Sequence, residues 1–195
     1  MFSRLVMLAV TAVFFSGCST TGVALKYAPP QNVVAVAAGT EGVSVGTFED
    51  KRGEPATYLG AIRGGFGNPL KTLESSTPVA TVVATAFADG LRTRGILTSG
   101  AKYEISGTIK VLECIQMVRR DATVEIDVKL VANDTKKEVF TKTVKANTLD
   151  GSIFNLATGV FASVEDLRAV TEKTLREAVD RALDDPEFRK ALKNS

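Results

Sequence analysis

The chain contains no histidine, and this absence removes several kinds of active site. Without an imidazole, neither Ser-His-Asp nor Cys-His catalysis is available, and no zinc site can use a histidine ligand. Cysteine is scarce as well, since the chain has only Cys18 and Cys114. We expect Cys114 to be a small buried apolar residue rather than a redox or nucleophilic group. We also expect no metal and no cofactor.

A large charge imbalance is also missing. The 24 basic residues nearly balance the 22 acidic ones, and the formal net charge is +2. Loss of residues 1–17 would remove only Arg4 and lower this charge by one. Nucleic-acid binding needs a basic patch or stripe, so we expect no nucleic-acid partner.

The amino-terminal residues hold an apolar run, Leu5–Phe15, that follows a single basic residue, Arg4. This layout is typical of a secretory signal, although an A-x-A-like cleavage site is missing. A membrane-spanning helix needs about 20 apolar residues, so the run is too short to be one. The alternative is a buried helix of a cytosolic protein, which is disfavoured because the polar segment Ser19–Thr21 follows at once.

Phe15-Ser16-Gly17-Cys18 resembles the lipobox of bacterial lipoproteins, in which two small residues precede an invariant cysteine. Phe15 replaces the leucine that is usual at its position. The resemblance implies that residues 1–17 are removed and that Cys18 carries acyl chains, which bind a bilayer with about 0.8 kcal/mol per buried CH₂. Ser19 differs from the aspartate that retains lipoproteins in the inner membrane of enteric-type bacteria. The resemblance therefore implies the outer membrane, facing the periplasm.

Three parts of the chain follow from this interpretation. Residues 1–17 are predicted to be a lipoprotein signal peptide, residues 18–40 the lipidated cysteine and a tether, and residues 41–195 a single periplasmic α/β domain. The proline pair Pro29-Pro30 favours an extended backbone for the tether over Ser19–Gln31. A first short strand is predicted over Val33–Ala38.

Alternating apolar and polar residues predict strands with one buried and one wet face. They lie at Val43–Phe48, Lys102–Val111, Asp121–Ala132 and Glu138–Ala146, with turn residues at Asn133–Lys137 before the last. From Gly53 to Ser76 the chain is rich in glycine, proline and threonine. This composition favours a mobile loop, with one short edge strand at Tyr58–Ile62.

Apolar residues at helical spacing predict a first helix that Thr77 caps and Pro78 begins. Its apolar face consists of Val79, Val82, Val83, Ala86, Phe87, Gly90 and Leu91. Gly95 ends this helix, after Arg92 and Arg94 in the last turn.

A second helix is predicted near the carboxyl end, where Ser163 and Asp166 resemble a capping box. Its apolar stripe consists of Leu167, Val170, Leu175, Ala178, Val179 and Ala182. Asp185-Pro186 ends this helix and begins a short final one with Phe188 and Leu192.

Together these elements predict an α+β fold, a two-layer sandwich in which two helices pack on one face of a mainly antiparallel sheet. The segment Ile153–Phe161, before the second helix, is too apolar for an ordinary solvent-exposed loop. We expect it to cover the core. The alternative is an exposed patch for a partner or a membrane.

Two carboxylates, Glu125 and Asp127, lie on one face of a predicted strand and invite comparison with a catalytic pair. Lys110 and Lys129 are expected nearby on the same sheet. A solvated ladder of paired charges is therefore the favoured interpretation.

The order of elements resembles the YajG family of bacterial lipoproteins over Val43–Leu192. The resemblance is carried by "LRTRG", "YEISGTIKVL", "TVEIDVKLVA", "LDGSIFN" and the final "LRAVTEKTLREAVDRALDDPEFRKAL". The opening "VGTFEDKRG" is also similar to other envelope lipoproteins, including auxiliary subunits of lipid transporters and the domain type seen in TolB and curli-secretion proteins. The YajG family has no established activity, so the resemblance implies a place and a fold but no catalytic residues.

The leading hypothesis is a lipid-anchored, non-enzymatic accessory protein that binds a protein partner in the envelope. Charged and glycine-rich loops beside a sheet often carry binding groups. We therefore expect a partner-binding loop at Asp50, Lys51, Arg52 and Arg63, the last in the Arg63–Gly67 loop. The alternative is a solvated turn held by an Asp–Arg pair. A phosphate cradle is disfavoured because no Gly-Lys-Ser/Thr follows Gly67.

Two other classes of function remain open. A lipid-handling or transporter-auxiliary subunit would need an apolar groove between the sheet and the helices. A carboxylate-dependent envelope hydrolase would need two carboxylates, such as Glu125 and Asp127, within about 5–10 Å of a bond in a cleft.

Overall fold

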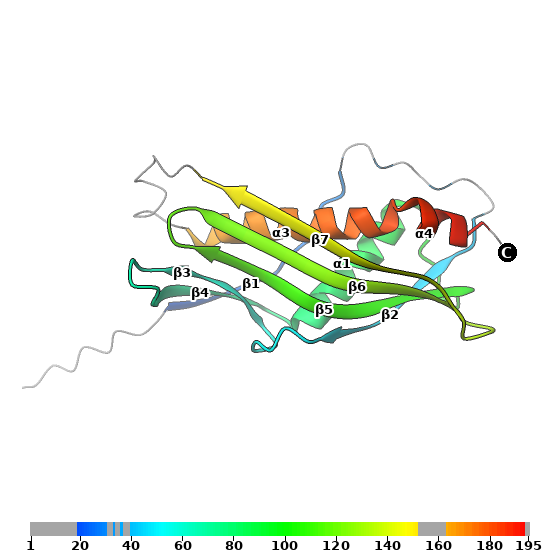
Figure 1. Cartoon of the computed structure of the whole chain (residues 1–195), viewed down its shortest axis with the longest axis horizontal. Helices are drawn as coiled ribbons and strands as arrows, with labels where there is room; N and C mark the ends of the chain where they lie inside the picture. Colours follow the sequence, from blue (N-terminus) through cyan, green and yellow to red (C-terminus); the bar gives the residue numbers. More distant parts are fainter. Residues whose placement is uncertain (1–18, 31–32, 34–35, 37–39, 152–162, 194–195) are drawn as a thin grey trace, which may run out of the picture.

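The structure, a computed structural model, describes residues 19–30, 33, 36, 40–151 and 163–193. Cys18 and Ile153–Phe161 lie outside these residues. So does most of Val33–Ala38, where the two described residues, Val33 and Val36, belong to no strand. Seven strands form a single sheet, and helices cover one of its faces (Figure 1).

The elements follow one another as strands, one helix, strands and two helices. The strands are β1 Ser19–Val23, β2 Val43–Asp50, β3 Tyr58–Arg63, β4 Pro69–Ser75, β5 Tyr103–Gln116, β6 Arg120–Ala132 and β7 Glu138–Asp150. The helices are α1 Val79–Thr93, α3 Val164–Leu183 and α4 Pro186–Ala191.

The sheet has the strand order β1-β4-β3-β5-β6-β7, with β2 also paired to β5. β5, β6 and β7 form an antiparallel meander, whereas β1 is parallel to β4 and both β2 and β3 are parallel to β5. β2 pairs with the first part of β5, up to Ile109, and β3 pairs with its last residues, Cys114 to Gln116. β2 and β3 therefore lie end to end along one side of β5. The predicted α+β fold with a mainly antiparallel sheet is confirmed.

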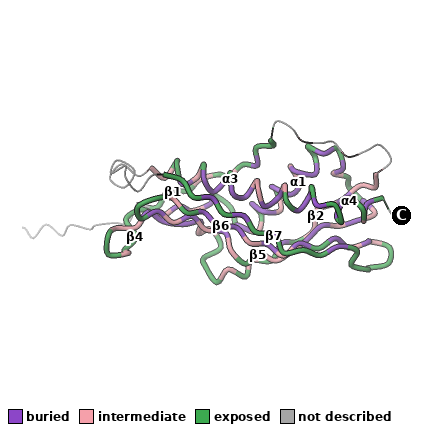
Figure 2. The backbone as a smooth tube through the Cα atoms, turned by 45° about the horizontal axis from the view of Figure 1, so that its top comes forward, coloured by how far each residue is buried: buried purple, intermediate pink, exposed green. Residues whose placement is uncertain are grey.

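Strict alternation builds the meander. The five predicted residues of β6, Ala122, Val124, Ile126, Val128 and Leu130, are all buried, and Ala132 at its end is buried as well. On β5 the alternation shifts at a bulge between Ile109 and Val111, so Ile109 is buried and Val111 only half-buried. Figure 2 shows buried residues along the strands and helices and exposed residues at the hairpin ends.

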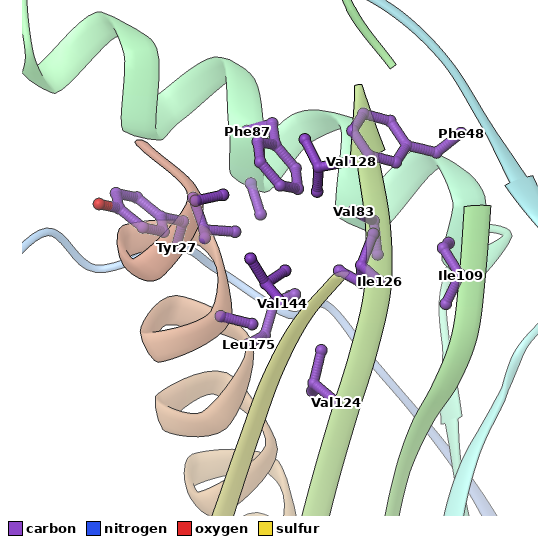
Figure 3. Packing of buried hydrophobic residues seen from close by; sticks show 14 of the residues in the cluster. Tyr27, Phe48, Val83, Phe87, Ile109, Val124, Ile126, Val128, Val144 and Leu175 are labelled. Carbon is purple, nitrogen blue, oxygen red and sulfur yellow. The ribbon is translucent and has the colours of Figure 1, made fainter. Parts of the chain in front are cut away.

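Both long helices bury the faces that their spacing predicts. All seven predicted apolar residues of α1 and all six of α3 are buried. Phe87 of α1 stacks on Phe48 of β2, with ring centroids 4.8 Å apart and planes 19° apart, in the core shown in Figure 3. Gly90 lets the two helices approach closely, since a Cβ at this position would lie 2.7 Å from Leu183 Cδ1 and 3.0 Å from Val179 Cγ1.

The carboxyl-terminal end of α1 is as predicted, whereas its amino-terminal end differs from the prediction. Thr77 does not cap the helix, since the cap residue is Pro78 and no side chain accepts a hydrogen bond there. The Val79 N–H instead donates to the Ala56 carbonyl at 2.8 Å. At the other end Gly95 has a φ of 74°, and the Ile96 N–H donates to the Leu91 carbonyl at 3.1 Å. This is the glycine-terminated helix end that the sequence predicts.

The two carboxyl-terminal helices are capped by side chains. Ser163 Oγ accepts a hydrogen bond from the Glu165 N–H at 3.1 Å, so Ser163 caps α3 as predicted. Asp166 does not complete a capping box, because its carboxylate accepts a hydrogen bond from Arg120 of β6 at 3.1 Å. Asp185 caps α4 by accepting from the Glu187 N–H at 2.8 Å.

Two predictions near the amino terminus differ from the structure. The Gly53–Ser76 region contains two strands, and β3 is an interior strand between β4 and β5 rather than an edge strand. Ser19–Val23, predicted as part of an extended tether, is strand β1 and pairs with β4 from Ser19↔Lys71 to Val23↔Ser75. Both differences arise from long-range pairing, which the local composition of these segments does not reveal.

Replacing Phe87 with Ala is expected to lower the free energy of unfolding by about 3–5 kcal/mol, because the ring is fully buried in the core. Phe66→Ala is the matched control, since Phe66 is fully exposed, and it should change stability by less than about 0.5 kcal/mol. Urea unfolding followed by circular dichroism measures both. Equal effects of the two substitutions would show that the packing face of α1 is misassigned.

Candidate functional site

The predicted partner-binding loop begins where β2 ends. There the Lys51 N–H still donates to the Ile109 carbonyl of β5 at 3.0 Å. The Arg52 side chain then turns inward and is only 3% exposed. Its Nη1 donates to the Tyr58 carbonyl at 2.6 Å and to the Leu112 carbonyl at 3.0 Å. Arg52 thus fills the gap between the end of β2, the start of β3 and the middle of β5.

Asp50 holds the other side of the Arg52 guanidinium. Arg52 Nε and Nη2 each donate to one carboxylate oxygen of Asp50, both at 2.9 Å. The hydrogen bond from Arg52 is the main cause that lowers the pKa of Asp50 below its usual range. The Asp–Arg pair of the alternative interpretation is therefore present, but Arg52 is not solvated. The Arg52 guanidinium bonds to groups inside the sheet and is not exposed to a partner.

Lys51 and Arg63 are placed differently. The Lys51 side chain is 60% exposed and forms an ion pair with Glu49 at 2.5 Å. Arg63 ends β3, and its Nη1 donates to the Gly67 carbonyl at 3.1 Å in the β3–β4 turn. β3 separates Arg63 from the Arg52 contacts by about 17 Å at the usual strand rise. The four predicted residues therefore do not form one surface.

A buried arginine, Arg94, which the sequence places among the cations of the last turn of α1, dominates the electrostatics of the fold. The Arg94 side chain has no exposed area. Its Nε and Nη2 donate to the two carboxylate oxygens of Asp184 at 3.0 and 2.8 Å, and Nη2 also donates to Asp180 at 3.0 Å. Arg94 therefore ties the end of α1 to the end of α3.

Tyr27 joins this cluster from the segment that follows β1. Arg94 Nη1 lies 3.3 Å from the Tyr27 hydroxyl, which donates to Asp180 at 2.6 Å. Burial, together with the hydrogen bond to Asp180, raises the pKa of Tyr27 to about 12. The hydroxyl therefore keeps its proton at neutral pH and remains a donor. In this way one guanidinium fixes both helices and the amino-terminal segment.

The charges of the cluster stabilise one another. Burial acts to lower the pKa of Arg94, but the hydrogen bonds to Asp184, Tyr27 and Asp180 outweigh it and raise that pKa. Burial likewise acts to raise the pKa of Asp184, and the bonds from Arg94 and Arg189 outweigh it and lower that pKa. The stability that Asp184 contributes is thus fully present at neutral pH and is lost as the pH falls through its lowered pKa.

The spacing of Arg94 could have revealed its burial. Phe87, Leu91 and Arg94 follow one another at intervals of four and three residues, which places Arg94 on the apolar face of α1. The acidic pair Asp180 and Asp184 has the same kind of spacing on α3. An arginine in register with the apolar face of one helix, together with two carboxylates one turn apart at the end of another helix, indicates a buried ion cluster.

The two carboxylates considered as a catalytic pair form a charged ladder instead. Lys110 Nζ lies 2.6 Å from Asp127 and 3.9 Å from Glu125, and Lys145 Nζ lies 2.9 Å from Glu125. The predicted ladder is confirmed, with Lys145 rather than Lys129 as its second cation. The hydrogen bond from Lys110 lowers the pKa of Asp127, whereas a general acid needs a raised pKa.

Cys114 is fully buried in β5, as predicted. Burial raises the pKa of its thiol to about 11, so the thiolate that nucleophilic or redox chemistry needs is scarce at neutral pH.

Within the described ranges, no group of three or more His, Cys, Asp or Glu residues is arranged to hold a metal ion. The helices in the same part of the chain are all too short or too polar to cross a membrane.

The family of the chain follows from comparison with known proteins. The model of a family described as "uncharacterized lipoprotein" matches residues 37–193, and the chain therefore belongs to this lipoprotein family. The match confirms the resemblance to the YajG family. No curated protein matches the chain.

Two solved structures are similar to this chain. A Xanthomonas campestris protein of family DUF330 is similar over 88% of this chain and 96% of its own, with 12% identity and a TM-score of 0.63. A Caulobacter crescentus protein described as a candidate lipoprotein is similar over 76% of this chain and 92% of its own, with 15% identity and a TM-score of 0.44. At such identities the first likeness shows a shared fold, and no activity follows from either.

Family membership sets the class of the protein. It is a bacterial lipoprotein, and as such it is anchored by lipid to a membrane of the cell envelope. The description of the family indicates no enzyme activity.

Arg94→Met is expected to destabilise the protein by about 3 kcal/mol, because it leaves two carboxylates without their buried partner. Arg92→Met is the matched control in the same helical turn. The Arg92 side chain is 63% exposed, so its pair with Asp89 should contribute less than about 1 kcal/mol. Chemical unfolding of both variants distinguishes them. Equal stability of the two would mean that the Arg94 cluster does not hold the helices together.

Proposed function

We propose that the protein is an accessory protein of the outer membrane that faces the periplasm, is anchored through acylated Cys18 and binds another envelope protein without catalysing a reaction. This proposal is carried by the coincidence of a sequence that resembles a lipobox, before Ser19, with a lipoprotein family match over residues 37–193. Ser19, in place of an aspartate, supports the outer membrane by resemblance.

The chemistry of the described residues supports a binding role over catalysis. Asp127 is held ionised by Lys110, and the Cys114 thiol is buried with a raised pKa. The chain offers no histidine to activate a nucleophile. A carboxylate-dependent hydrolase would need one carboxylic acid that keeps its proton near neutral pH, and the lysines beside Glu125 and Asp127 oppose this.

A lipid-handling subunit is the second candidate, and it requires an apolar groove between the sheet and the helices. That space is occupied by core side chains with little or no exposure, among them Phe48, Phe87, Ile126, Val144 and Leu175 (Figure 3). A tightly packed layer of this kind favours the accessory protein. Binding of a lipid there would have to displace the core.

For the partner surface we propose the exposed charge pair at the end of β2 and the start of the β2–β3 connection. Lys51 and Glu49 are both about 60% exposed, whereas Arg52 beside them is buried. Arg52 supports this turn from inside by bonding to Asp50, Tyr58 and Leu112. A rigid turn that presents one exposed charge pair is suited to partner recognition, because little conformational entropy is lost on binding.

The anchor is tested by metabolic labelling with palmitate. The wild-type protein is expected to be labelled and to lack residues 1–17 by mass spectrometry, whereas Cys18→Ser should carry no label. Cys114→Ser is the matched control, because Cys114 is buried in β5 and should leave labelling unchanged. Label retained by Cys18→Ser would refute the anchor.

The partner surface is tested by crosslinking in intact envelopes. Lys51→Glu is expected to lose crosslinked species that the wild type forms, because it reverses the charge of the exposed pair. Lys137→Glu makes the same change in the exposed turn between β6 and β7 and should keep these species. Arg52→Ala is unsuitable here, since it disrupts the sheet. A crosslinking pattern that Lys51→Glu leaves intact would remove this turn from consideration.

A further inference from the structure

Exposed apolar side chains gather at one end of the sheet. Among the described residues, the large apolar side chains with high exposure are Phe66, which is fully exposed, and Leu70, Met117, Val118 and Leu149, which are about half exposed, together with the less exposed Val139. Phe66 lies in the β3–β4 turn, and Met117 and Val118 lie in the β5–β6 turn. Val139, in contrast, lies near the start of β7, at the opposite end.

The strand register places these five residues together. Starting from β1, the paired residues are Ser19↔Lys71, Lys71↔Ile62, Ile62↔Gln116, Gln116↔Arg120 and Arg120↔Asp150, which form one row across six strands. Both turns project just beyond this row, and Leu70 and Leu149 are next to it in sequence. We call this row with its two turns the anchor end. In Figure 1 both turns and the end of β7 lie on the left, opposite α4.

The position of β1 decides what faces the anchor end. Cys18 precedes Ser19, and Ser19 is already paired with Lys71 in the row. If Ser19–Gln31 were a free tether, the domain could lie roughly 45 Å from Cys18. Because Ser19 is instead part of the sheet, Cys18 is only one Cα–Cα step, about 3.8 Å, from the row. An acyl group on Cys18 therefore holds the anchor end within one residue of the bilayer. The interfacial layer of a bilayer is itself about 5–8 Å deep on each side, so the exposed side chains reach it.

The charges at this end suit the interface with phospholipid. Arg63 is half-buried at the end of β3 and Arg119 is exposed in the β5–β6 turn. Arg120 is already neutralised by Asp150 at 2.8 Å and Asp166 at 3.1 Å. Two arginines beside exposed apolar side chains match a surface that offers phosphate groups above hydrocarbon.

We propose that the anchor end is a membrane-docking surface, in which Phe66, Met117 and Val118 insert into the leaflet that holds the acyl chains of Cys18. Arg63 and Arg119 lie at the level of the lipid phosphates. The inference rests on the proposed acylation of Cys18, and it adds that the domain stands on the bilayer by this end. An exposed apolar patch of this kind marks an interaction surface, and the short anchor selects the bilayer as its occupant.

The chain contains no tryptophan, so a single introduced tryptophan reports its own surroundings alone. Phe66→Trp and Val118→Trp place the reporter in the two turns of the anchor end, and Val139→Trp is the matched control at the opposite end. Each full-length lipidated variant is reconstituted into phosphatidylethanolamine–phosphatidylglycerol vesicles with or without brominated acyl chains. Flotation of the vesicles measures anchoring, and loss of fluorescence in the brominated vesicles measures contact with lipid.

The docking surface predicts that all three variants float and that tryptophan at 66 and 118 loses most of its fluorescence, while tryptophan at 139 loses little. Floating protein in which all three positions are equally unquenched would overturn docking and leave the anchor intact. A blue-shifted but unquenched tryptophan at 66 would also overturn it, because a second copy or another protein would then cover this end. Protein that fails to float would refute the acyl anchor and docking together.

Discussion

The ion cluster around Arg94 is the interaction on which the arrangement of the domain depends. A guanidinium with no exposed area is tolerated because two carboxylates at the end of α3, a tyrosine hydroxyl and a backbone carbonyl surround it. These partners come from three separate parts of the chain, so the cluster forms only when α1, α3 and the segment after β1 are all in place. Because Tyr27 follows β1 closely, the same cluster also fixes β1, which directly follows the proposed acylation site Cys18. A single buried charge thus links the packing of the two helices to the position of the amino-terminal strand β1.

Arg52 joins separate strands within the sheet, as Arg94 joins the helices. β2 and β3 share one side of β5, and the chain between them has to leave β5 and return to it. Backbone carbonyls at that break would lack partners, and Arg52 supplies donors to two of them while Asp50 neutralises its charge. The envelope protein therefore uses two of its arginines as internal supports. Arg52 also supports the turn that carries Lys51, the residue proposed above for partner recognition.

The sequence predicted the elements whose local pattern is strong, and it missed those that depend on distant pairing. The meander β5–β7 and the helices α1 and α3 follow from periodicity, because each buries one continuous face. β1 and β4 are short and have no apolar alternation, and their pairing joins residues that are about fifty positions apart. The loop Asp50–Arg52 is charged, as predicted, but composition does not reveal how deeply each side chain is buried. Arg52 and Arg94 therefore resembled surface cations, although the helical spacing of Arg94 carried a signal of burial.

The parallel pairing of β1 with β4 has a mechanical consequence. β1 runs inward from the anchor end, and its five residues are paired in register with Lys71 to Ser75. A pull on the proposed acyl chains of Cys18, directed away from the domain, would act along the strand axis and load all of these pairs in shear. The bonds then resist together instead of opening one at a time, as they would in a peeled strand. With Cys18 acylated as proposed, a force on the lipid would reach the whole sheet through β1.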